Sequence, residues 1–230
     1  MVGRIINFNW SFFNRCGSMK TVISLGGSLI YPDNIDYEYL KKFVDVIESY
    51  DSKFAIICGG GKLARELQDN ASNISDAKKD LLGIEATKQN ATVVKSLFTD
   101  VYDRVVQDPT EKVETEKKVV VYSGWKPGWS TDYDAVLIAE DKVINMSNVD
   151  YVHDSDPKKN PDAKPLHEIS WENFKKLVGD KWKPGLSMPF DPIAAKEAHQ
   201  RKIKVLIIGP DLVNLKNVLD GKDFNGTIIS

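Results

Sequence analysis

The sequence predicts an α/β fold, a three-layer sandwich in which an open, mainly parallel sheet lies between helices. Short apolar runs alternate with stretches of helical periodicity over most of the chain, which is the pattern of repeated βα units. Two of the apolar runs end in glycine clusters, Gly26-Gly27 and Gly59-Gly60-Gly61. Because ligands bind at the carboxyl ends of strands in such sheets, these glycines mark the expected site.

The apolar runs of strand length are expected to form the sheet, at residues 21–25, 54–58, 101–106, 118–122, 143–146, 204–208 and 227–229. Helices are expected between them, at residues 40–47, 63–71, 81–97, 133–140, 191–198 and 212–219. Asp191 followed by Pro192 is a strong helix start, because it combines an N-cap residue with a proline at the first helical position. Residues 107–116 are expected to form a hairpin or loop, and residues 154–164 a polar loop.

Composition narrows the class of protein. The chain has 230 residues, and we expect residues 19–230 to form a single domain after a flexible extension over residues 1–18. The net charge of −2 argues against a nucleic-acid partner. No apolar run approaches the ~18–20 residues of a membrane span, so no membrane partner is expected. The low cysteine count and the absence of a signal-peptide pattern favour the cytoplasm, and Cys58 is interpreted as a buried, inert thiol.

A third glycine-containing loop, residues 124–132, follows another expected strand and carries two hydroxyl groups, a lysine and a carboxylate. We expect all three loops to bind anions. A backbone without Cβ atoms can approach phosphate oxygens closely, and a helix N-terminus supplies N–H groups that have no intrahelical partner. Two phosphate sites side by side are the geometry that a phosphoryl transferase needs.

Other interpretations of the second glycine cluster fit less well. A Walker A loop is excluded because no Ser or Thr follows Lys62. A dinucleotide fingerprint needs an acidic residue at the end of the next strand, whereas Asp76 and Asp80 begin a helical pattern. The histidines show no metal-ligand spacing, so no metal site built from protein ligands is predicted.

Taken together, the motifs resemble the amino-acid kinase superfamily, and most closely its archaeal-type UMP kinases. The resemblance covers residue 19 to the C-terminus in order and spacing. Its motifs are residues 24–28, 59–65, 80–91, 127–132, 148–150, 156–157, 162–164, 191–196 and 226–227.

That resemblance implies direct in-line transfer of the ATP γ-phosphoryl group to UMP, a step of pyrimidine nucleotide synthesis. The residues that would contact ATP are Ser24, Gly26, Gly27, Ser28, Gly61, Arg65, Ser147, Asn148, His153 and Asp156. Those that would contact UMP are Gly60, Asp80, Trp125, Lys126, Pro127, Gly128, Trp129, Ser130 and Thr131. The expected catalytic residues are Lys62, Arg65 and Lys183, which would neutralise phosphate charge, and Asp132, which would orient the cationic groups.

The same resemblance implies Mg²⁺ bound mainly through the ATP phosphates and a homo-oligomer, a hexamer as in related UMP kinases. Two alternatives stay open. One is a kinase of the same fold with another small acceptor; an isopentenyl phosphate kinase is disfavoured because no histidine occurs between Gly59 and Thr131. The other is a non-catalytic nucleotide- or oxyanion-binding protein, which the unusual Trp125 and Tyr151 leave possible.

Overall fold

A seven-stranded sheet forms the centre of the computed structural model, which describes residues 20–71, 74–157, 159–179 and 189–230. Across the sheet the strands are β3 (Val119–Tyr122), β2 (Phe54–Cys58), β1 (Thr21–Leu25), β4 (Lys142–Met146), β8 (Lys204–Ile208), β9 (Thr227–Ile229) and β7 (Glu168–Ile169). All neighbours from β3 to β8 are parallel, whereas β9 runs antiparallel to β8. A separate antiparallel pair consists of β5 (Val152–His153) and β6 (Pro165–Leu166).

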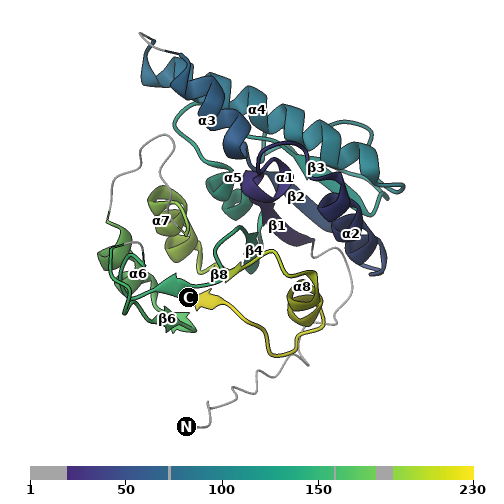
Figure 1. The fold of residues 1–230 in the computed structure, drawn as a ribbon. Helices are drawn as coiled ribbons and strands as arrows, with labels where there is room; N and C mark the ends of the chain where they lie inside the picture. Colours follow the sequence, from purple (N-terminus) through teal and green to yellow (C-terminus); the bar gives the residue numbers. More distant parts are fainter. Residues whose placement is uncertain (1–19, 72–73, 158, 180–188) are drawn as a thin grey trace.

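Helices cover both faces of this sheet (Figure 1). In chain order they are α1 (Gly27–Ile30), α2 (Tyr37–Glu48), α3 (Gly61–Asp69), α4 (Asp76–Leu97), α5 (Thr131–Ile138), α6 (Trp171–Val178), α7 (Pro192–Arg201) and α8 (Leu212–Leu219). Side chains of α2, α4 and α8 pack in the core on one face, and those of α5, α6 and α7 pack on the other. The predicted three-layer architecture is therefore confirmed.

The alternation of side chains along the strands explains the two cores. Ile23 and Leu25 of β1 lie in the first core, whereas Val22 between them in the pleat lies in the second. All three are buried, as expected for a central parallel strand covered on both faces. Within the described ranges, no helix is long and apolar enough to cross a bilayer.

The predicted strand at residues 101–106 is wrong. Val101 and Val106 each form an isolated bridge, to Val119 and Tyr122 respectively, and no continuous strand joins them. The intervening Asp103 and Arg104 are exposed, and Arg104 pairs with Glu111. The run therefore lies beside β3 and is joined to it by the two bridges, with two exposed charged residues at its centre and no regular ladder.

Several helices begin earlier than the apolar periodicity indicates. Helix α4 begins at Asp76 rather than at residue 81, and α5 begins at Thr131 rather than at residue 133. Their first turns are polar, so hydrophobic spacing does not reveal them. At α5 the cap itself is visible, because the Ser130 hydroxyl accepts the Tyr133 N–H at 3.2 Å. Helices α1 and α6 and the short strands β5, β6 and β7 were not predicted.

Candidate functional site

The first two glycine clusters pack directly against each other at the carboxyl ends of β1 and β2. A Cβ atom on Gly27 would lie 2.5 Å from the Cα of Gly61, and one on Gly59 would lie 2.6 Å from the Gly27 nitrogen. Gly61 has a φ of +61°, and a Cβ there would overlap the Gly27 carbonyl. Glycine is therefore required for two backbones to come this close.

Helix α3 begins within this contact. Its N-cap is Gly60, which has no side chain to accept a hydrogen bond from the first turn. The N–H groups of that turn have no intrahelical acceptor, and the helix dipole adds positive potential at the same end. The site thus has the local structure that binds a phosphate group.

Helix α4 holds the second glycine cluster in place through hydrogen bonds. The buried amide of Asn90 donates to the carbonyl oxygens of Gly59 at 2.8 Å and Gly60 at 3.2 Å. One turn earlier, the Thr87 hydroxyl accepts the N–H of Gly124 at 2.8 Å. A single helix, α4, therefore fixes the positions of the second and third loops relative to each other.

Asp132 joins three elements below the loops. Its carboxylate accepts the Ser24 hydroxyl at 3.1 Å, the Asn145 amide at 2.7 Å and the Asp191 backbone N–H at 3.2 Å. Burial, with the nearby Asp191 charge, raises the pKa of Asp132 to about 7. Because three donors from different elements converge on its carboxylate, Asp132 links β1, β4 and the start of α7.

Asp191 is the N-cap that the sequence predicted. Its side chain accepts the N–H of Ile193 at 2.9 Å and a hydrogen bond from the Ser130 hydroxyl. Burial raises the pKa of this carboxyl group as well. Ser130 therefore both caps α5 and links it to α7.

Backbone amides anchor the third loop at both ends; in the structure this loop spans residues 123–130, because β3 ends at Tyr122 and α5 begins at Thr131. The N–H of Ser123 donates to the Val106 carbonyl at 3.0 Å, and that of Trp125 donates to Asp134 Oδ2 at 3.1 Å. Near the other end, the Gly128 N–H donates to Asp80 Oδ2 at 2.8 Å. Since these amide N–H groups already have acceptors within the protein, we expect this loop to contact a ligand mainly through its side chains.

Aromatic rings surround the lysine of the third loop. The Lys126 ammonium nitrogen lies 3.7 Å from the centroid of Trp125 and 5.1 Å from that of Trp129. Trp129 in turn lies 4.1 Å from Tyr133, centroid to centroid. The ring faces attract the cation and hold its position, so Lys126 is a preorganised positive charge at the rim of the site.

The other predicted cations differ in their surroundings. Lys62, in the first turn of α3, pairs with Asp33 and lies 3.8 Å from a Glu66 carboxylate oxygen. An anion at this position would have to compete with those exposed carboxylates. Arg65 is exposed one turn further along α3. Lys183 lies outside the described residues.

The residues expected on the donor side fall into two places. Gly26 and Ser147 are neighbours, because a Cβ on Gly26 would lie 3.4 Å from the Cα of Ser147, and Asn148 follows at the exposed end of β4. Ser28 lies on α1, beside the glycine contact. His153 lies on β5 of the small second sheet and Asp156 in the loop that follows β5, so neither residue lies on a strand of the main sheet.

Four polar residues of this region were missed in the sequence. They are Thr87, Asn90, Asp134 and Asn145, all of them buried. Asn145 interrupts the apolar strand β4, and Asp134 interrupts an otherwise apolar stretch of α5. A polar residue within an otherwise apolar run could have revealed Asn145 and Asp134 in the sequence, because a buried polar side chain needs a hydrogen-bond partner.

In the part of the chain that the structure describes, no three His, Cys, Asp or Glu side chains converge as metal ligands. His199 lies 3.2 Å from a Glu172 carboxylate oxygen on the surface. Cys58 is fully buried, and burial raises the pKa of its thiol, as the prediction of an inert thiol requires.

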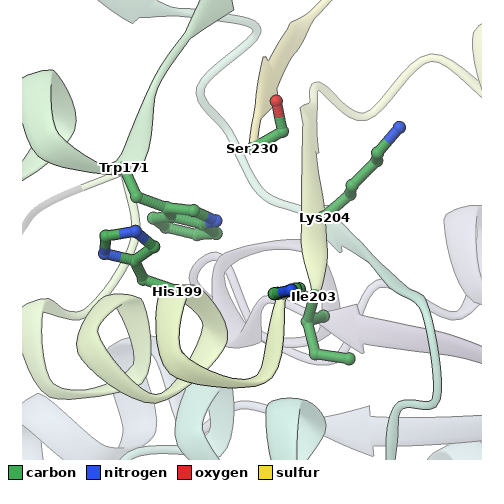
Figure 2. Close-up of a pocket in the computed structure, with 6 residues that line it drawn as sticks. Trp171, His199, Ile203, Lys204 and Ser230 are labelled. Atoms are coloured by element: carbon green, nitrogen blue, oxygen red, sulfur yellow. The ribbon is translucent and has the colours of Figure 1, made fainter.

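A pocket of about 220 Å³ lies at the opposite edge of the sheet (Figure 2). It is lined by Trp171, His199, Lys202, Ile203, Lys204 and Ser230. These residues come from the amino end of β8, the end of the antiparallel β9 and the adjoining helices. Trp171 also packs against Phe174 and Phe190, so it is primarily a core residue. The pocket is separate from the glycine loops, which follow the carboxyl ends of the strands.

Comparison with known proteins places this geometry in a family. A model of the amino acid kinase family matches residues 19–209. The uridylate kinase of Pyrococcus abyssi is 38% identical over 223 residues, covering 91% of this chain and 99% of the relative. That of Thermoplasma volcanium is 37% identical over 213 residues, covering 87% and 93%.

Solved structures agree. The crystal structure of uridylate kinase from Archaeoglobus fulgidus matches with a TM-score of 0.79 at 33% identity, over 92% of this chain and all of that one. The UMP kinase of Bacillus anthracis matches with a TM-score of 0.73 at 17% identity, over 92% and 95%, which supports the fold alone.

Proposed function

The chain belongs to the amino acid kinase family, and from this premise we propose that it transfers the γ-phosphoryl group of ATP to the phosphate of UMP. The relatives compared above at 33–38% identity are uridylate kinases, and the match extends over nearly the whole length of each. The observation that carries the proposal is the backbone contact between Gly27 and Gly61. It gives two phosphate-binding loops a common boundary, across which a phosphoryl group can pass.

The position of this contact in the sheet supports the same conclusion. β1 lies between β2 and β4, so the chain leaves β1 towards one side and later returns on the other. The space at the carboxyl end of such a switch point is where nucleotides bind in open α/β sheets. ATP phosphates would lie on the first loop and the start of α3, and the UMP phosphate between Gly60 and the third loop.

The proposed reaction needs positioning and charge neutralisation more than a reactive side chain. A phosphate oxygen of UMP is already a competent nucleophile, so no protein base is required. Lys126, Arg65 and Lys62 would supply positive charge to the transferring group. Asp132 would act by holding Ser24 and the start of α7 in place. Lys183 remains a proposed cation on the basis of the family resemblance.

Mg²⁺ fits this site as a partner of the nucleotide. When bound, it would neutralise and orient ATP phosphate oxygens, and it commonly keeps most of its ligands from phosphates and water. The absence of a three-carboxylate cluster among the described residues is compatible with that mode of binding. A cytoplasmic, hexameric enzyme is a further proposal from the family resemblance, and light scattering on the purified protein tests the hexamer.

Product analysis tests the proposed function. Incubation with Mg-ATP and UMP should yield UDP and ADP in equal amounts, which ³¹P NMR can follow directly. Omission of UMP should leave ATP intact, because water is not the intended acceptor. Formation of free phosphate without UDP, or no turnover of ATP at all, would contradict the proposal.

A further inference from the structure

A buried carboxyl group lies directly behind the third loop. Asp134, in the first turn of α5, is 1% exposed. Its Oδ2 accepts the Trp125 N–H at 3.1 Å, whereas its Oδ1 is buried and has no hydrogen-bond partner among the described residues. A buried carboxylate oxygen without a donor is costly when charged, so this group favours its protonated form.

The anchors of the third loop differ in kind. The amides of Ser123 and Gly124 donate to a backbone carbonyl and to the Thr87 hydroxyl, neither of which can ionise at ordinary pH. The next amide, that of Trp125, donates to Asp134, which can. The loop therefore has two titratable attachments. Asp134, at the amide immediately before Lys126, is buried, whereas Asp80, at Gly128, is partly exposed.

The charges facing Asp134 come from three elements. Asp132 lies on its own helix, Asp108 in the loop after Val106, and Lys126 in the third loop. Burial is the main cause that raises the pKa of Asp134, to about 8, and the two aspartates add to it. The Trp125 N–H and Lys126 act in the opposite direction.

We propose that Asp134 is a positioning residue that controls how tightly the third loop takes up its anionic acceptor. While uncharged, Asp134 anchors the Trp125 amide without placing negative charge beside Lys126. When ionised, it offsets the positive charge of Lys126 and repels a phosphate at the loop. This inference rests on the proposed kinase function and goes beyond it by assigning the alkaline control of acceptor binding to one residue.

Kinetics with Asp134→Asn test the proposal, because asparagine has the same shape and stays neutral. In the wild-type enzyme the KM for UMP should rise at least about threefold between pH 7 and pH 9.5, with kcat changing much less. In the variant the KM should stay level over that range. An equal rise of KM in both proteins would overturn the proposal.

Thr87→Val separates anchoring from charge, since it removes the acceptor of the neighbouring Gly124 amide without touching Asp134. Its KM for UMP should be higher at every pH but should keep the wild-type pH dependence. Loss of that dependence would contradict the assignment to Asp134. Asp45→Asn, on the exposed face of α2, is the matched neutral control and should behave as wild type.

A readout without substrate distinguishes failure of this inference from failure of the kinase proposal. The folded protein keeps a proton on Asp134 that the unfolded chain releases near pH 4, so stability falls as pH rises towards about 8 and levels off above it. The Tm of the wild type should therefore drop more between pH 6.5 and 9.5 than that of Asp134→Asn. Identical drops would overturn the inference even if UMP is phosphorylated; absence of UDP with unequal drops would instead count against the kinase proposal.

Discussion

At the scale of single residues, Asp132 shows how one carboxylate can connect three elements at the edge of the sheet. Ser24, Asn145 and the backbone of Asp191 all donate to it. A carboxylate has enough lone pairs to accept all three, whereas a protonated or amidated group would turn a donor towards another donor. The residue is therefore expected to work in its ionised form.

Asp132→Asn should lower turnover at least about tenfold, which corresponds to roughly 1.4 kcal/mol of activation free energy. The amide NH₂ would oppose one of the three donors and disturb the start of α7. Steady-state rates at saturating ATP and UMP measure the effect, and circular dichroism confirms that the variant is folded. Unchanged turnover in a folded variant would remove Asp132 from the organising role.

The pH profile provides the control for this assignment. Because burial raises the pKa of Asp132 to about 7, the wild-type kcat should fall as pH decreases through that value. The residual activity of Asp132→Asn should lack this acidic limb. Persistence of the limb in the variant would assign it to another group, such as a substrate phosphate.

At the scale of elements, the glycine clusters act through their backbones. The first loop meets the second so closely that neither Gly27 nor Gly61 can carry a side chain. Asn90 of α4 donates to the carbonyl groups of Gly59 and Gly60, and the Gly60 carbonyl also accepts the Ala64 N–H at 3.3 Å. The proposed phosphate site is thus shaped by the strand ends and a supporting helix, before any charged side chain contributes.

Gly61→Ala and Gly179→Ala form a matched pair that isolates this contact. Both glycines have positive φ, +61° and +78°, but a Cβ on Gly179 would meet nothing within 4 Å. Gly179→Ala should cost about 1–3 kcal/mol of unfolding free energy from backbone strain alone, because its ψ of −169° with positive φ is a conformation essentially confined to glycine. Gly61→Ala should cost about 1–3 kcal/mol more, because it also overpacks the loop contact.

Urea denaturation of the two variants measures the difference, and ATP binding by calorimetry should be lost or strongly weakened only in Gly61→Ala. Equal stability of the two variants, with ATP binding intact in both, would show that the loops do not need their close approach.

Also at the element scale, the sequence predicted more of the fold than of the site's internal bonding. Apolar runs located the central strands, and glycines located the loops at their carboxyl ends. The run at residues 101–106 misled because its valines are spaced like a strand while Asp103 and Arg104 face solvent. The polar first turn of α4 carries no hydrophobic spacing, so its true start at Asp76 was invisible.

At the scale of the whole molecule, the site depends on contacts between distant parts of the chain. Ser24 and Asp132 are 108 residues apart, and Asp191 comes from yet another element. Their residue types are evident in the sequence, but their pairing follows from the sheet order, which places β1 between β2 and β4. That is why the family resemblance could name candidate residues, whereas the hydrogen bonds of the buried Asn90 and Asp134 emerged only with the structure.

The acceptor preference of the purified protein tests the central claim most directly. With Mg-ATP as donor, ADP release should be measured with UMP, CMP, AMP and glutamate at equal concentrations. We expect UMP to be phosphorylated far faster than the other three, with UDP as the product. No ADP release above background with any nucleoside monophosphate, or a clear preference for glutamate, would contradict the account.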